Sequence, residues 1–285
     1  MIGYTCGEYD ILRSKDLQDL DKQIQLSRKN GNKYFGVGVY DSNLCQHLGI
    51  DAPLKSLEDR LAIMSHIRGV DFVFPVISLH EDILRDSVKQ GYLKHQSSPV
   101  SENAETKTYE YGYAPGTYDL FHVGHLENLT IASNYCQKLI VGIKADELVE
   151  KHKKKKPFIS AEERMEILRH FKFVYDVYTY YTRDLHIAND WFNAKYGKSF
   201  DVVFFGSDLK NDFSNIDDIK IIFTPRSPEK MKTRSTSAYR TLILGPQSTS
   251  SQQHFTTSSI SEIKHSSSQD SSHQTLLQKG DQETK

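Results

Sequence analysis

The sequence predicts an α/β fold with parallel sheets, and it predicts that this fold occurs twice in the chain. Strand-like and helix-like segments alternate along the sequence, and such alternation is typical of a parallel sheet covered by helices on both faces. The same short motifs also recur at a nearly constant spacing, which indicates an internal duplication. A length of 285 residues suits about two domains of ordinary size.

The duplication is visible in residue spacing alone. The pattern Gly-x-Tyr-Asp at residues 7–10 recurs at residues 116–119, an offset of 109. Val-Gly-Val at residues 37–39 matches Val-Gly-Ile at residues 141–143 with an offset of 104, so the first copy carries five extra residues, which we place near Asn30. Further single residues keep the offset of 104: Pro53, Glu58, Arg60, His66 and Val70 match Pro157, Glu162, Arg164, His170 and Val174.

Each copy is expected to run strand, helix, strand, loop, helix, strand. In the second copy, residues 109–114 are strand-like, Leu126, Leu129 and Ala132 have the spacing of an amphipathic helix, and residues 138–143 form a buried strand. The next helix should begin with a capping box, Ser160-x-x-Glu163. Only the second copy continues, with predicted strands at 201–205 and 220–223 and a final helix near 237–244.

Composition sets the expected boundaries. Residues 245–285 contain 11 Ser, 5 Thr and 7 Gln with no helical or strand period, so we expect a disordered tail. Residues 94–108 have the polar composition of a linker. The predicted domains are therefore 1–93, a shorter copy, and 109–244, a fuller copy.

Charge, hydropathy and cysteine content exclude several classes of protein. The net charge is −1, which removes any whole-chain argument for nucleic-acid binding. The longest apolar runs, such as 72–77, are far too short to cross a membrane, and the first eight residues do not resemble a secretion signal. The three cysteines are widely spaced without a disulfide or metal pattern, so a cytoplasmic location is expected.

The comparison of the two copies separates structural from chemical candidates. Residues identical in both copies favour a structural role: Gly116, Tyr118, Asp119, Arg164 and His170. His122 and His125 differ, because Arg13 and Asp16 stand at the matching places of the first copy. Two histidines three residues apart at the start of a helix project to one side, where helix N–H groups and imidazole donors would bind phosphate. A pair of surface histidines and half of a metal site are the competing interpretations, and no third metal ligand is evident.

The ten residues 116–125, Gly-Thr-Tyr-Asp-Leu-Phe-His-Val-Gly-His, resemble the G-T-F-D-L-F-H-x-G-H signature of cytidylyltransferases, with Tyr118 in place of Phe. These enzymes act on glycerol 3-phosphate, phosphocholine or phosphoethanolamine and belong to the H-x-G-H nucleotidyltransferase superfamily. The resemblance extends over 109–244 and implies a Rossmann-like nucleotidyltransferase domain, preceded by a truncated, degenerate copy.

The resemblance implies that a phosphoalcohol attacks the α-phosphate of CTP directly and that pyrophosphate leaves with the Mg²⁺ that the nucleotide carries. The products would be a CDP-alcohol, a precursor of phospholipid or cell-surface polymer, and pyrophosphate. His122 and His125 would stabilise the transition state, and Lys153 would contact the phosphates. The lysine-rich segment 151–156 resembles the K-H-K-G of the phosphoethanolamine enzymes, and its competing interpretation is a solvated basic loop. No metal site formed by the protein itself is expected.

The remaining site residues are also implied by family motifs. Gly116, Thr117, Asp119 and Gly124 belong to the signature, and Gly206 and Asp208 would face the cytosine and ribose. The segment Arg226…Ser235-Thr236 resembles the R-T-x-G-I-S-T-S motif but departs from it, because Ser235 lies nine positions after Arg226 where the family has five. Arg234 is the alternative to Arg226.

Two other functions stay open at this stage. An adenylyltransferase that uses ATP would carry the same H-x-G-H motif, and a non-catalytic nucleotide-binding or assembly protein would explain the altered Arg226 segment. The first copy is predicted to be inactive. It would pair with the second as a pseudo-dimer, and a homodimer is the alternative.

Overall fold

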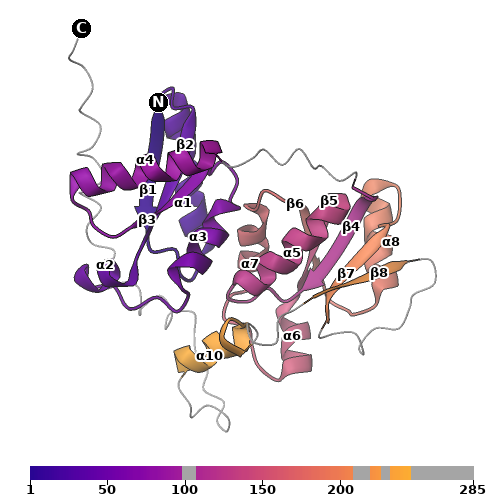
Figure 1. Cartoon of the computed structure of the whole chain (residues 1–285). Coiled ribbons are helices and arrows are strands. Elements are labelled where there is room, and N and C mark those ends of the chain that lie inside the picture. Colours follow the sequence, from indigo (N-terminus) through magenta and orange to yellow (C-terminus); the bar gives the residue numbers. More distant parts are fainter. Residues whose placement is uncertain (98–106, 208–218, 226–231, 245–285) are drawn as a thin grey trace.

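The computed structural model describes residues 1–97, 107–207, 219–225 and 232–244, and it confirms a Rossmann-like α/β fold with parallel sheets (Figure 1). The N-terminal half holds three parallel strands in the order β1-β2-β3. Its elements are β1 Ile2–Gly7, α1 Ser14–Lys29, β2 Tyr34–Tyr40, α2 Ser42–His47, α3 Leu57–Ser65, β3 Phe72–Val76 and α4 Glu81–Ser97.

The C-terminal half holds five parallel strands in the order β6-β5-β4-β7-β8. Its elements are β4 Tyr109–Gly116, α5 Val123–Tyr135, β5 Cys136–Lys144, α6 Asp146–Lys153, α7 Ala161–Arg169, β6 Val174–Tyr180, α8 Leu185–Tyr196, β7 Val202–Gly206, β8 Lys220–Thr224 and α10 Thr236–Leu244. The strand order reverses between β4 and β7, and ligands of open parallel sheets bind at such a reversal.

The two sheets have the same strand register. Gly7 lies opposite Val39 and Gly116 lies opposite Ile143, so the offsets of 109 and 104 meet at one place in the structure. The register between the second and third strands also agrees, since Val37 pairs with Val73 and residue 141 pairs with residue 177. The repeat seen in the sequence thus describes the geometry of both sheets.

Corresponding loops in the two halves are held by matching side chains. The Asp10 carboxylate accepts hydrogen bonds from the backbone N–H groups of Leu54 and Lys55, both at 2.9 Å. Asp119 accepts the corresponding bonds from Phe158 and Ile159. A buried carboxylate is stable in this setting because backbone donors replace water.

Two fully buried arginines repeat the same arrangement. Arg60 donates to the carbonyl oxygens of Glu8 and Tyr40, both at 2.7 Å, and to that of Lys55 at 3.2 Å. Arg164 binds the three carbonyls at the matching positions, which are those of Thr117, Lys144 and Ile159. Each arginine therefore joins three loops at the carboxyl ends of its sheet.

The structure differs from the expected local pattern in four places. Helices α4 and α8, which were not predicted, follow the third strands of the two sheets. The segments expected to be loops after the second strands contain short helices, α2 and α6. Helix α4 continues to Ser97, four residues into the segment that composition marked as a linker, 94–108. At the predicted capping box, the Ser160 hydroxyl accepts from the Glu163 N–H at 3.3 Å, but the Glu163 carboxylate binds Arg13 and Ser14 of the other half.

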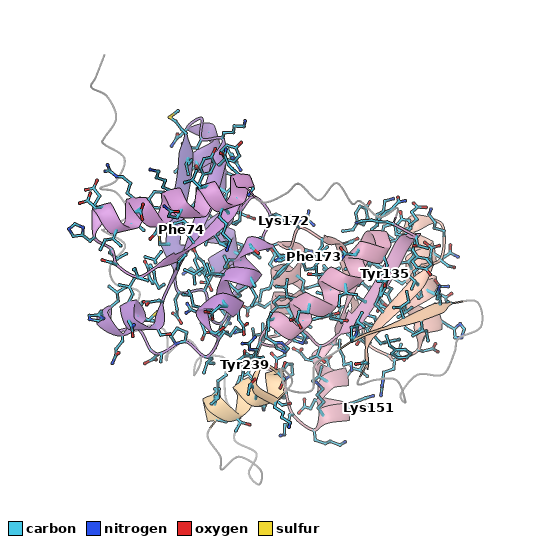
Figure 2. All side chains as sticks on the ribbon, viewed as in Figure 1. Phe74, Tyr135, Lys151, Lys172, Phe173 and Tyr239 are labelled. Carbon is cyan, nitrogen blue, oxygen red and sulfur yellow. The ribbon has the colours of Figure 1, made fainter. Side chains whose placement is uncertain are left out.

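The two halves meet through a reciprocal contact at residues 66–68 and 170–172. The Arg68 N–H donates to the His170 carbonyl at 2.8 Å, and the Lys172 N–H donates to the His66 carbonyl at 2.9 Å. Lys172 and Phe173 lie at this junction in Figure 2. The offset of 104 relates His66 to His170 and Arg68 to Lys172, so the contact has pseudo-twofold symmetry. One apolar core, which includes Ile67 and Phe171, extends across the junction.

Among the described helices, none combines the length and the apolar character needed to cross a membrane. The predicted tail, 245–285, lies outside the described residues.

Candidate functional site

A cavity of about 350 Å³ lies at the carboxyl ends of β4 and β7, where the strand order reverses. The start of α5, the end of α6, the start of α8 and the segment before α10 complete its wall. Its lining contains most of the predicted site residues: Gly116, Thr117, His122, Gly124, His125, Lys153, Gly206, Ser235 and Thr236. Asp208 and Arg226 lie outside the described residues.

The two histidines lie against each other at the start of α5. His122 is the N-cap residue, and its Nδ1 accepts a hydrogen bond from the Gly124 N–H at 3.1 Å. In a neutral imidazole, an accepting Nδ1 leaves the proton on Nε2, so Nε2 is the donor that this ring can offer to a ligand. The His125 ring stacks on it with centroids 3.8 Å apart, and both side chains belong to buried residues that line the cavity.

At two positions of the signature, Gly116 and Gly124, the packing leaves little room for a side chain. A Cβ on Gly116 would lie 2.6 Å from the Tyr118 ring, which folds back over the strand end because Tyr118 has a φ of 55°. A Cβ on Gly124 would lie 3.1 Å from the His122 ring. Small residues at these positions let the backbone and imidazole approach each other at the cavity wall.

Asp119 is buried and holds the backbone of segments next to the cavity. Its carboxylate holds the backbone of residues 158 and 159, and its carbonyl oxygen accepts a hydrogen bond from the Thr236 hydroxyl at 2.9 Å. Burial raises the pKa of Asp119, and the N–H donors and Arg164 oppose that rise. These contacts agree with a structural role, and nucleotide binding by Asp119 stays a prediction.

Lys153 ends α6 and reaches the cavity beside two cations that the motifs did not identify, Lys144 and Arg183. Lys151–Lys153 thus form the last turn of a helix, where the sequence suggested a loop. Burial and the charges of Lys144 and Arg183 lower the pKa of His152 on the same turn. This side of the cavity is positively charged.

The segment before α10 forms another part of the cavity wall. The Ser235 hydroxyl accepts from the Ala238 N–H at 3.2 Å, as an N-terminal cap does. Arg234 precedes it and lines the cavity, so the alternative arginine is brought to the site. Its guanidinium also forms an ion pair with Asp59 of the N-terminal half at 3.2 Å.

The comparison of the two copies contained the signal that would have identified Lys144 and Arg183. By the offset of 104 they correspond to Tyr40 and Leu79, so both cations are confined to the fuller copy, like the histidine pair. Both also follow or end strands of the sheet, where ligands gather. Within the described parts of the chain, no cluster of three His, Cys, Asp or Glu residues has the arrangement of a metal site.

Comparison with known proteins gives a family match and partial relatives. The model of the family described as cytidylyltransferase-like matches residues 113–269, more than half of the chain. An FAD synthase of Thermococcus onnurineus (strain NA1) is 42% identical over 65 residues, which are 23% of this chain and 43% of that protein. A probable ethanolamine-phosphate cytidylyltransferase of Encephalitozoon cuniculi (strain GB-M1) is 37% identical over 65 residues, which are 23% of this chain and 20% of that protein.

The matched region spans less than half of the length of either relative. Among solved structures, the lipopolysaccharide core biosynthesis protein of Thermoplasma volcanium GSS1 has a TM-score of 0.32 and 18% identity, covering 40% of this chain and 96% of that one.

Proposed function

This chain belongs to the cytidylyltransferase-like family, and we propose that it transfers a nucleotidyl group from a Mg²⁺-nucleoside triphosphate to a phosphorylated acceptor. The preferred reaction is CMP transfer from CTP to a small phosphoalcohol such as glycerol 3-phosphate, phosphoethanolamine or phosphocholine. The proposed setting is the cytoplasm.

The observation that carries this proposal is the stacked pair His122–His125 at the start of α5, inside a cavity with four cationic side chains. The cations are Lys144, Lys153, Arg183 and Arg234, against the carboxylates of Glu127 and Asp184. Asp184 is also engaged as the N-cap of α8, where it accepts from the His186 N–H at 2.9 Å. Such a cavity suits a ligand with several phosphates.

The chemistry requires alignment and charge stabilisation. An acceptor phosphate oxygen forms a bond to the α-phosphorus, the bond from that phosphorus to the bridging oxygen breaks, and pyrophosphate leaves with its Mg²⁺. No proton has to be removed from the acceptor when its phosphate is ionised. Imidazole N–H groups and cations that bind the spreading charge would therefore supply the rate enhancement.

The second candidate is adenylyl transfer from ATP. It is favoured by the FAD synthase relatives, which reach 42% identity in the matched region. The H-x-G-H residues would bind the triphosphate of either nucleotide, and the base would be selected near Gly206 and Ser207, where β7 ends. A nucleotide-binding protein without catalysis is a third outcome of the same test.

The test is to incubate the full chain with Mg²⁺ and CTP or ATP and to measure pyrophosphate release. The acceptor panel is glycerol 3-phosphate, phosphoethanolamine, phosphocholine and flavin mononucleotide. Release with CTP and one phosphoalcohol supports the first reaction, and release with ATP alone supports the second. A folded chain that binds nucleotide but releases no pyrophosphate with any acceptor contradicts the enzymatic proposal.

For the N-terminal half we propose a degenerate, inactive copy that pairs with the C-terminal half as a second subunit would. Arg13, at the place of His122, is bound by Glu163 through two hydrogen bonds of 2.6 and 2.8 Å, so it is engaged in the junction. A fragment that begins near Lys107 should therefore aggregate or self-associate. A monomeric, active fragment would contradict this proposal.

A further inference from the structure

A pocket residue, Arg234, is held by a carboxylate of the N-terminal half. Its Nη1 lies 3.2 Å from Oδ1 of Asp59. The Asp59 side chain is 5% exposed, while the arginine side chain is 40% exposed. Placing a carboxylate out of water is costly unless cations and donors compensate it, so the pairing favours one orientation of the guanidinium.

Asp59 itself has a rigid position. It is the third residue of α3, and its N–H donates to the hydroxyl of the N-cap residue, Ser56, at 3.2 Å. Helix α3 packs against α5, the helix that begins with the histidine pair. Residues of both helices belong to one apolar core, so α3 and its carboxylate pack against the helix that borders the cavity.

The same half contacts α10 at a second point. The Lys55 Nζ lies 5.1 Å from the centre of the Tyr239 ring, and Tyr239 is a buried residue whose ring is 6.0 Å from that of His122. Figure 2 shows Tyr239 on the side of α10 that faces the two sheets. The segment that follows Arg234 is thus fixed between Lys55 and the histidine.

A similar ion pair crosses the junction in the opposite direction. The offset of 104 relates Asp59 to Glu163, and Glu163 binds Arg13 of the N-terminal half. Neither Glu163 nor Arg13 lines the cavity, whereas Arg234 does. The Glu163 pair therefore provides a matched control: a carboxylate at the same helix position, with an arginine partner, but without contact to the site.

We infer that Asp59 is a positioning residue for nucleotide binding, which acts by holding Arg234 where its guanidinium binds a phosphate of the nucleotide. This inference rests on the proposed nucleotide site. The N-terminal half would then contribute to the site of the C-terminal half, although the N-terminal half has no H-x-G-H motif of its own.

The experiment measures the affinity of the full chain for MgCTP and MgATP by calorimetry, with the thermal midpoint as a check on folding. Asp59→Asn keeps the shape of the side chain and removes its charge, and we expect the affinity to fall about tenfold. Asp59→Glu should restore most of it. Glu163→Gln should lower the thermal midpoint, because it breaks an ion pair at the junction, and leave the affinity within about twofold, because neither Glu163 nor Arg13 lines the cavity.

A double-mutant cycle with Arg234→Ala separates positioning from general stability. If Asp59 acts through Arg234, the double variant binds no more weakly than Arg234→Ala alone. Additive losses, unchanged affinity in Asp59→Asn, or an equal loss in Glu163→Gln would each overturn the inference. If the wild-type chain binds neither nucleotide, the nucleotide site itself is wrong, and the inference fails with it.

Discussion

Replacing Arg164 with methionine should lower both the free energy of unfolding and the affinity for nucleotide, and comparison with a matched arginine shows which effect belongs to the cavity. The arginine is fully buried and donates to the carbonyl oxygens of Ile159 at 2.8 Å and Lys144 at 2.9 Å, and also to Thr117 and Asp146. Methionine fills much of the volume but leaves these acceptors without donors. A buried acceptor without a donor costs about 1–3 kcal/mol, so the loss of three such bonds should cost about 3 kcal/mol or more.

Arg60→Met provides the control because Arg60 holds the matching carbonyls in the N-terminal half. Its unfolding cost should be similar, about 3 kcal/mol or more, because this change also leaves three carbonyl oxygens without donors. Only Arg164 holds residues of the cavity wall, Thr117 and Lys144. We therefore expect Arg164→Met to weaken nucleotide binding about tenfold and Arg60→Met to weaken it by a smaller factor, because Arg60 supports only the Lys55 segment and α3 next to the site.

The assay combines urea unfolding with nucleotide titration. The single tryptophan, Trp191, lies in α8 of the C-terminal half, so its fluorescence reports the unfolding of that half. Arg164→Lys is the milder variant, because lysine keeps a charge in the site and replaces part of the hydrogen bonding. The reasoning is refuted if Arg60→Met weakens nucleotide binding as much as Arg164→Met, or if Arg164→Met alters neither unfolding nor binding.

Four further results are expected. His125→Ala should lower turnover about 100-fold or more, because a donor to the transition state is lost, and unchanged kcat would remove it from the mechanism. Lys153→Ala should raise the KM for nucleotide about tenfold and weaken its salt dependence; an unaltered KM would leave the lysine as a solvated helix end. Burial raises the pKa of Glu163, but the hydrogen bond and charge of Arg13 outweigh it, so the carboxyl pKa is lowered. The stability from this pair is therefore present above the ordinary pKa of about 4.3 and is lost as the pH falls through the lowered value, so the unfolding free energies of wild type and Glu163→Gln should converge in acid; a constant gap would contradict the pairing. Burial raises the pKa of Cys136 to about 11, so iodoacetamide at pH 8 should modify it only after unfolding, and rapid modification of the native chain would show that β5 opens.

Short-range patterns were sufficient for much of the fold. The spacing of apolar residues predicted the strands of the C-terminal half and the helices α5, α7 and α10, whereas α6 and α8 were not predicted. The two offsets recur in the register that both sheets share. The signature at 116–125 and the lysine segment predicted residues that line one cavity. Strands, helices and motif residues depend on neighbouring residues and on the geometry of one sheet, so they can be predicted from the sequence.

The contacts of single charged side chains could not be predicted from the sequence. The Ser160-x-x-Glu163 pattern predicted a local capping box, yet the Glu163 carboxylate binds Arg13, which is 150 residues away in the chain. Asp59 carries no motif, and its contact with Arg234 depends on how the two halves pack. Sequence spacing contains no information on such distant pairs.

The residue pattern alone predicted a repeated parallel-sheet unit, located the histidine pair in the C-terminal half, and predicted the longer sheet for that half. The tertiary structure decided which charges surround the histidines, because Lys144, Arg183 and Arg234 come from separate strand ends and loops that only the folded sheet brings together. It also decided that the N-terminal half contacts the site, since the Asp59 and Lys55 contacts arise from packing across the junction. A motif identifies residues that are close in the sequence, whereas ion pairs between distant residues depend on how whole helices and sheets pack.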